Sequence, residues 1–429
     1  MDLFGIPGPL LFGQLLLGLI NGAFYALLSL GLAVIFGMLN VINFTHGAQF
    51  MMGAFVAWML LSLGTSPAAA IAMALMLLPC AMLVLEWALT RAGLRPSLRW
   101  AVLGAVAFAW LCSLLFSVAD SPLAWARLLL PQASATLHAL MALVGLALVV
   151  LLADEVMARI PLARTFRRGG MAAIAALWLL SMLFGVTGSP ATIVAALLPN
   201  GLSYWWALLL SPLIVGCTGV IMERSMISRL YQLDHLYGLL LTFGAGLILE
   251  GLFRNEFGSS GLPYRIPPEL SGAWDLGFMF MPVYRGWVVA VAFVMCLATW
   301  LIIEKTKIGS YLRAATENPS LVQAFGINVP RMMTLTYGAG VALAAFAGVL
   351  AAPIYSVNPQ MGSNLIIIVF AVVVIGGMGS ILGSVLTGFG LGVVEGLTKV
   401  FYPEGSSTVI FVVMAIVLLA RPAGLFGRS

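Results

Sequence analysis

Residues 376–396 read GGMGSILGSVLTGFGLGVVEG. A small residue recurs at every fourth position of this run: Ser380, Ser384, Gly388, Gly392 and Gly396. On a helix these positions form one stripe, and in a membrane such a stripe lets two helix backbones approach closely. The preceding Gly376 and Gly377 permit a sharp turn or an unwound segment inside a bundle. The run therefore fits either close helix packing or a broken membrane element beside a translocation path.

The rest of the chain is equally apolar. Hydrophobic residues make up 62% of its 429 positions, and charged residues make up 8%. A soluble domain has roughly a quarter of its residues charged, so the outer surface of this protein must face lipid. Because helices satisfy their own backbone hydrogen bonds in lipid, the composition predicts an all-α, polytopic membrane bundle.

About 13 segments are apolar enough to be embedded in the membrane. Those before the middle of the chain are 11–37, 43–64, 67–89, 100–118, 136–153, 171–188 and 204–222. The later ones are 236–253, 286–303, 332–352, 364–376, 380–397 and 407–420. If the N-terminus is periplasmic, most of the 20 basic residues fall in cytoplasmic loops, as the positive-inside rule requires. This orientation makes the C-terminus cytoplasmic, the stretch 254–285 periplasmic and the stretch 304–331 cytoplasmic.

The stretch 304–331 contains signals for a short capped helix. Asn318 suits the N-cap and Pro319 the first helical position, while Gly326 can supply a left-handed stop. The apolar residues between these caps are expected to share one exposed face: Leu321, Val322 and Phe325. Such a helix fits a docking element for a cytosolic partner, and it equally fits an amphipathic helix lying on the membrane surface.

Polar residues interrupt the first two apolar segments. The pair Asn21-Gly22 is expected to break the first helix, and Asn43, Thr45 and His46 lie in the link to the second. Polar side chains at membrane depth require partners or water. These residues therefore either hydrogen-bond between helices or line a solute path, as Gly376 and Gly377 could also do.

The sequence contains no motif for catalysis. It has no phosphate-binding GxxxxGK[ST] loop and no HExxH zinc motif, and its basic residues form no stripe that would bind nucleic acid. We therefore expect no metal, no cofactor and no nucleic-acid partner. The charges at Glu395 and Lys399 are four residues apart, so we expect them to pair at a helix end.

Four further motifs occur in a fixed order along the chain. They are Asn21-Gly-Ala-Phe-Tyr-Ala-Leu with Asn43-Phe-Thr-His-Gly, then Arg313-Ala-Ala-Thr-Glu-Asn-Pro, then Val374-Ile-Gly-Gly-Met-Gly-Ser, and finally Arg421-Pro-Ala-Gly-Leu-Phe-Gly. This set resembles the bacterial branched-chain amino acid ABC transporter permeases. The resemblance covers roughly 1–64 and 204–429.

The resemblance implies a non-catalytic permease subunit of an ABC importer in the bacterial inner membrane. Its solute would be a branched-chain amino acid or a related compound, such as urea, an amide or an aromatic acid. The implied partners are a second related permease or a second copy, two cytosolic ABC ATPases, and a periplasmic solute-binding protein. Residues implied in ATPase coupling are Glu317, Asn318, Pro319, Leu321, Val322, Phe325 and Gly326. A stand-alone secondary transporter or channel is the alternative, and it would be expected to carry paired intramembrane charges.

The chain departs from this family between residues 65 and 203. Family members connect their second and third core helices directly, whereas here about 140 residues intervene. We interpret this stretch as an extra membrane insert of about four helices between two core parts, 1–64 and 204–429. An even number of helices returns the chain to the same side of the membrane, so the core topology is expected to survive.

Overall fold

The computed structural model describes residues 2–3, 6–39, 41–62, 67–93, 96–97, 99–100, 102–104, 106–107, 201–231, 233–277 and 280–427. The chain divides into two compact units. The first comprises Met1–Trp58 and Ser203–Ser429, and the second comprises Met59–Leu202. The predicted segments 136–153 and 171–188 lie outside the described residues, as does most of 100–118.

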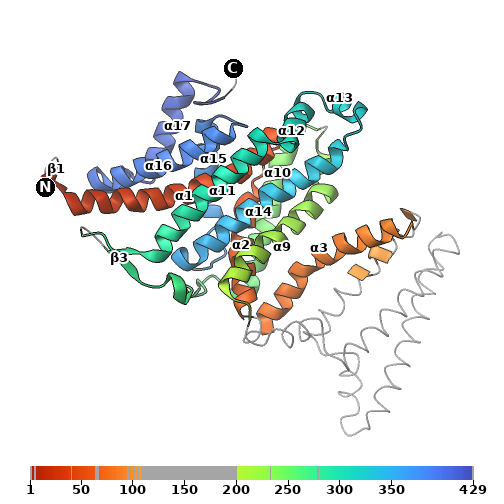
Figure 1. Cartoon of the computed structure of the whole chain (residues 1–429), viewed down its shortest axis with the longest axis horizontal. Helices are drawn as coiled ribbons and strands as arrows, with labels where there is room; N and C mark the ends of the chain where they lie inside the picture. Colours follow the sequence, from red (N-terminus) through yellow and green to blue (C-terminus); the bar gives the residue numbers. More distant parts are fainter. Residues whose placement is uncertain are drawn as a thin grey trace, which may run out of the picture. The chain divides into compact units, whose positions relative to one another are not determined.

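The first unit is a helical bundle (Figure 1). Its long helices are α1 (Gly8–Leu39), α2 (Thr45–Ser62, which ends in the second unit), α9 (Tyr204–Ser225), α10 (His235–Phe257), α11 (Val283–Lys305), α14 (Val329–Tyr355), α15 (Ser363–Gly376), α16 (Ile381–Phe401) and α17 (Val409–Ala420). Between α11 and α14 lie the shorter α12 (Lys307–Glu317) and α13 (Pro319–Ala324). In this part of the chain, every predicted apolar segment forms a helix.

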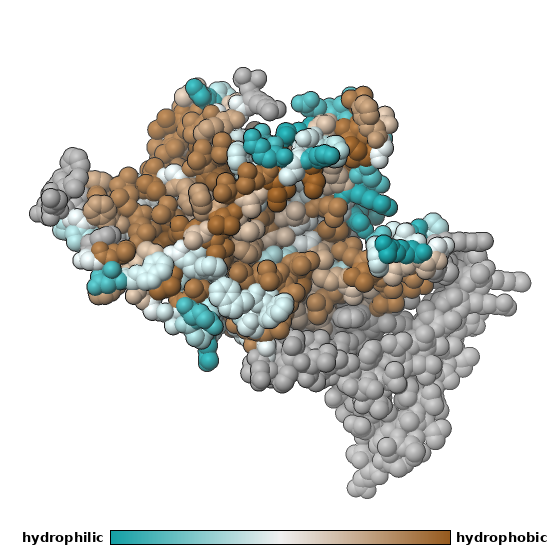
Figure 2. Space-filling model, in the orientation of Figure 1, coloured by the Kyte–Doolittle hydropathy of each residue, from teal (hydrophilic) through white to brown (hydrophobic). Residues whose placement is uncertain are grey.

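These helices confirm a polytopic membrane architecture. Among the described residues, seven helices are long and apolar enough to cross a membrane, and two shorter apolar helices are Ser363–Gly376 and Val409–Ala420. Hydrophobic side chains cover the visible flank of the first unit over α1, α11 and α16, whereas hydrophilic ones gather near α12 and near β3 (Figure 2). Such a flank suits contact with lipid. The total of about 13 segments and the orientation remain predictions.

The expected break in the first helix at Asn21-Gly22 is wrong, because α1 is continuous from Gly8 to Leu39. Gly22 serves close packing instead. A Cβ atom at this position would lie 3.0 Å from the Cα of Phe389 and 3.2 Å from the carbonyl oxygen of Gly388. The glycine therefore marks a place where α16 approaches α1, and the helix hydrogen bonds continue through it.

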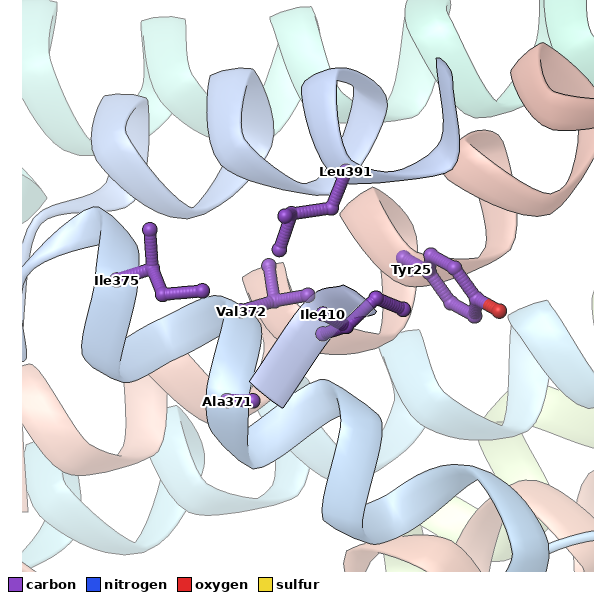
Figure 3. Close-up of a cluster of buried hydrophobic side chains, with 6 residues drawn as sticks. All are labelled: Tyr25, Ala371, Val372, Ile375, Leu391 and Ile410. Carbon is purple, nitrogen blue, oxygen red and sulfur yellow. The ribbon is translucent and has the colours of Figure 1, made fainter. Parts of the chain in front are cut away.

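Apolar packing joins four helices of the first unit at the cluster shown in Figure 3. Tyr25 comes from α1, Leu391 from α16 and Ile410 from α17, and the remaining members are Ala371, Val372 and Ile375 of α15. Ile410 is the only buried residue of α17. The cluster therefore holds the last helix against the bundle through Ile410 and through the partly buried α17 residues that pack around it: Val409, Phe411, Val413, Met414 and Val417.

Among the described residues, the strands form two small hairpins and short turns connect the helices. The strands are β1 (Asp2–Leu3) with β2 (Ile6–Pro7), and β3 (Ala273–Asp275) with β4 (Phe280–Pro282). The 3-10 turns are η1 (Ile227–Arg229), η2 (Pro268–Leu270) and η3 (Pro403–Gly405). The second hairpin lies in the polar stretch 254–285, at the end of the bundle opposite to α12 and α13 (Figure 1).

The second unit contains α3 (Pro67–Arg91). The chain enters and leaves this unit at neighbouring positions. The backbone N–H of Leu202 donates to the carbonyl of Leu60 at 2.8 Å, and the Cα of Gly201 faces the backbone of Leu61. The two ends of the intervening segment are therefore adjacent in space.

Candidate coupling and translocation sites

The short helix α13 is formed by local capping. The side chain of Asn318 accepts from the backbone N–H of Leu321 at 3.0 Å, and Pro319 occupies the first helical position. Gly326 has a φ of 83°, which is the left-handed conformation that glycine adopts without strain. Glu317 is the last residue of α12 and is exposed, so α12 and α13 meet at Asn318.

The expectation that Leu321, Val322 and Phe325 form one exposed face is wrong for Val322. This side chain is only 4% exposed and packs with Ala315 of α12 and Val329 of α14. Leu321 and Phe325 are 55% and 78% exposed. Consecutive residues on a helix point about 100° apart, so Val322 turns inward while its neighbours face solvent. The buried valine anchors α13, and the two exposed residues form its free apolar surface.

The small-residue stripe of α16 lies against α1. Gly388 faces the backbone of Ala26, and Gly392 faces the backbone of Gly18 and Gly22. Gly396 continues the contact toward the backbone of Gln14, and the carbonyl of Ser384 accepts from Ser29 Oγ at 3.3 Å. We call this contact the α1–α16 seam: Ser384, Gly388, Gly392 and Gly396 against α1.

Ser380, the first residue of the predicted stripe, has a different place. Its side chain caps α16 by accepting from the N–H of Gly383 at 3.1 Å. The glycines before it form the turn between α15 and α16, where Gly377 has a φ of 97°. Gly376 faces Gly383 across this turn, and Gly377 packs against the backbone of Gly427.

The C-terminal residues fold back onto the same turn. The N–H of Leu425 donates to the carbonyl of Ile375 at 2.8 Å, and the N–H of Phe426 donates to the carbonyl of Gly376 at 3.2 Å. The structure therefore brings the motif that begins at Arg421 together with the motif that begins at Val374. Gly376 and Gly377 are both buried, with backbone atoms close to the position that a Cβ would occupy on each.

The polar residues of the link between α1 and α2 are buried. Asn43 Nδ2 donates to Gln49 Oε1 at 3.1 Å, Thr45 Oγ1 donates to the carbonyl of Thr242 at 2.6 Å, and His46 Nε2 lies 3.0 Å from the carbonyl of Leu28. These bonds tie the link to α1, α2 and α10. Asn43 Oδ1 and His46 Nδ1 are buried without a hydrogen-bond partner in this part of the chain.

A buried polar cluster surrounds Glu395 on α16. Glu395 pairs with Lys399 at 2.5 Å, as expected, but it is only 7% exposed. It also accepts from Tyr25 Oη at 2.7 Å and from Asn21 Nδ2 at 3.3 Å. Asn21 in turn accepts from Tyr355 Oη at 2.8 Å. The four-residue spacing predicts only the pair at the helix end and not these long-range partners, although a carboxylate within an apolar run is a usable signal for them.

Comparisons with known proteins agree with the motif resemblance. Residues 138–418 match the family described as branched-chain amino acid transport system / permease component. The high-affinity branched-chain amino acid transport system permease protein LivH of Escherichia coli (strain K12) is 29% identical over 248 residues, which cover 55% of this chain and 80% of that protein. No solved structure matches this chain.

Two further relatives show how widely the similarity extends. The permease protein BraD of Pseudomonas aeruginosa is 29% identical over 223 residues, covering 51% of this chain and 73% of BraD. The ribose import permease protein RbsC of Escherichia coli (strain K12) is 26% identical over 223 residues, covering 48% of this chain and 65% of RbsC. Since the family match spans more than half of the sequence, this chain belongs to the family of branched-chain amino acid transport system permease components.

Proposed function

We propose that this protein is the membrane-spanning permease subunit of an ABC importer for branched-chain amino acids or related small solutes. The observation that carries the proposal is α13, a capped helix with an exposed apolar surface, held rigidly at one end of an apolar bundle. A helix this short gains little stability from its own propensity. The exposed Leu321 and Phe325 therefore suit burial by a partner subunit. The names of LivH and BraD support the solute class.

The partners follow from the same role. The complex contains two cytosolic ABC ATPases, and each binds the coupling surface of one permease. The second permease is a related chain or another copy of this one. The stretch 254–285, with its β3–β4 hairpin, faces a periplasmic solute-binding protein. This arrangement requires the N-terminus to be periplasmic and the C-terminus cytoplasmic in the inner membrane, which the distribution of Lys and Arg supports.

The mechanism is alternating access without chemistry in this chain. A loaded binding protein delivers solute to a cavity between the two permeases, and ATP binding in the ATPases moves the coupling helices. The ligands shift the equilibrium between the two states only by their differential affinity for them. Residues Asn21, Asn43, Thr45 and His46 would border the path in the open state. Asn43, Thr45 and His46 are buried in this structure and Asn21 is half-buried, which fits a closed state.

The insert 65–203 is proposed to be an accessory part of the membrane region. The backbone hydrogen bond between Leu202 and Leu60 shows that the chain leaves and re-enters the core at adjacent points. The core helices therefore need no rearrangement to accommodate the insert. It therefore needs no place in the coupling route.

The test is reconstitution of the chain with its ATPases, binding protein and second permease in proteoliposomes. We expect uptake of labelled L-leucine that requires internal ATP and external binding protein. The pair of Lys399 with the buried Glu395 is the feature that favours the alternative, a stand-alone secondary transporter. Uptake by this chain alone, driven by an ion gradient and indifferent to ATP, would establish that alternative and refute the importer.

A further inference from the structure

A second buried carboxylate lies between α9 and α14, close to the coupling segment. Glu223 of α9 is 2% exposed. Its Oε2 accepts from Thr334 Oγ1 at 2.6 Å, and its Oε1 accepts from Tyr231 Oη at 2.8 Å. Among the described residues no basic side chain pairs with it. Glu223 thus depends on two hydroxyl groups to compensate for its loss of water.

The two hydroxyls come from different sides of the contact: Thr334 belongs to the helix that follows the coupling segment, and Tyr231 belongs to the connection that follows α9. Thr334 lies in the second turn of α14, and α14 begins at Val329, which packs on Val322 of α13. Tyr231 follows η1 in the connection from α9 to α10. Burial and the neighbouring Glu223 carboxylate raise the pKa of Tyr231, so its hydroxyl stays a donor. A push on α13 therefore reaches Glu223 through a continuous helix.

Beyond Glu223, the contact between α9 and α14 is tight packing of small residues. A Cβ at Gly338 would lie 2.6 Å from Val220 Cγ2, and one at Gly219 would lie 2.7 Å from Val341 Cγ2. One turn after Thr334, Tyr337 accepts a hydrogen bond from Gln49 Nε2 at 3.5 Å. Gln49 is the residue that binds Asn43 in the link between α1 and α2. Helix α14 thus carries both the bond to Glu223 and, one turn later, a bond to the residue that holds the polar link.

We propose that Glu223 is a positioning residue for transport: it ties the coupling segment to α9 through Thr334, while Tyr231 orients its carboxylate, so that movement of α13 is transmitted to the membrane helices. The inference rests on the proposed importer function. Without this tie, α14 can shift against α9 when α13 is displaced, and ATP hydrolysis proceeds without opening the path. The consequence is uncoupling, with the bundle itself intact.

The test is Thr334→Val, which removes the hydroxyl and keeps the shape of the side chain. Thr336→Val is the matched control, because among the described residues the hydroxyl of Thr336 bonds only to the carbonyl of Met332 in its own helix. Both variants are purified in the full complex and reconstituted, and L-leucine imported per ATP hydrolysed is measured. Thr334→Val is expected to lower this ratio about tenfold, the factor associated with one hydrogen bond to a charged group. Thr334→Ser, which retains the hydroxyl, is expected to restore it.

The outcomes separate this inference from the importer function. If the unmodified complex imports no L-leucine with ATP, the proposed function fails. If the unmodified complex works and Thr334→Val matches Thr336→Val in the coupling ratio, the role of Glu223 is overturned. Should Thr334→Val not assemble, Tyr231→Phe removes the other hydroxyl and decides the question: a normal ratio refutes the inference, and a lowered ratio with an unchanged melting temperature supports it.

Discussion

The α1–α16 seam allows a quantitative prediction from a single methyl group. In Gly388→Ala, the new Cβ would lie 2.5 Å from both the Cα and the N of Ala26, and 2.9 Å from its Cβ. Ordinary contacts are at least 3.4 Å. Because the obstructing atoms belong mainly to backbone, no rotamer change can relieve the clash, and the two helices must separate locally by about 1 Å.

This separation sets the magnitude of the effect. Overpacking a well-packed interior costs about 1–3 kcal/mol, and the absence of a soft neighbour places Gly388→Ala near 3 kcal/mol. Gly390→Ala, in the same helix, is the matched control. No neighbouring atom lies within 4 Å of the position that its new Cβ would occupy. An alanine there should be neutral or should stabilise the helix by up to about 1 kcal/mol.

The assay is thermal unfolding of each purified variant in the same detergent, followed by intrinsic tryptophan fluorescence. A loss of 3 kcal/mol corresponds to a melting temperature lower by roughly 5–10 °C for a unit of this size. Gly390→Ala controls for the general effect of replacing glycine in α16. Equal melting temperatures for the two variants would show that the helices are not in close contact in the membrane protein, and the packing argument would fail.

Four further predictions concern the coupling segment, the topology and the insert. Phe325→Asp is expected to weaken ATPase binding about 100-fold in pull-down titrations without changing the melting temperature, because it places a charge in the proposed interface. Val322→Asp should instead loosen the segment by about 3 kcal/mol, seen as faster proteolysis of the loop, since that carboxylate would be buried without a partner. In spheroplasts, an impermeant thiol reagent should label Arg265→Cys but not Thr316→Cys; the reverse pattern would invert the topology. Replacing 65–203 by a short linker should leave ATPase association intact, and loss of association in a folded protein would contradict the accessory role.

Apolar run length was sufficient to predict the long helices in the described part of the first unit, whereas α12 lies in a charged stretch and was not predicted. In lipid, a continuous apolar segment has few alternatives to a helix. The error at Gly22 shows the limit of this reasoning. Glycine both weakens a helix and permits close approach, and only the position of the partner helix decides which effect applies. In this protein α16 supplies that partner, so α1 remains unbroken.

The candidate site was harder to predict because its contacts join distant parts of the sequence. Spacing placed Leu321 and Phe325 on one helix face, but it could not show that α12 and α14 cover Val322. The pair Glu395–Lys399 was readable from spacing. Its hydrogen bond from Tyr25 depends on the approach of α16 to α1, which no local pattern encodes.

The backfolded C-terminal residues have a consequence for biosynthesis. The carbonyls of Ile375 and Gly376 at the end of α15 are satisfied by the N–H groups of Leu425 and Phe426, which the ribosome adds only after α16 and α17. Until then these two carbonyls lack the partners that they have in the folded chain. The turn between α15 and α16 therefore completes its hydrogen bonds only after α17 has been synthesised, so the order of synthesis makes this turn one of the last parts of the bundle to reach its final structure.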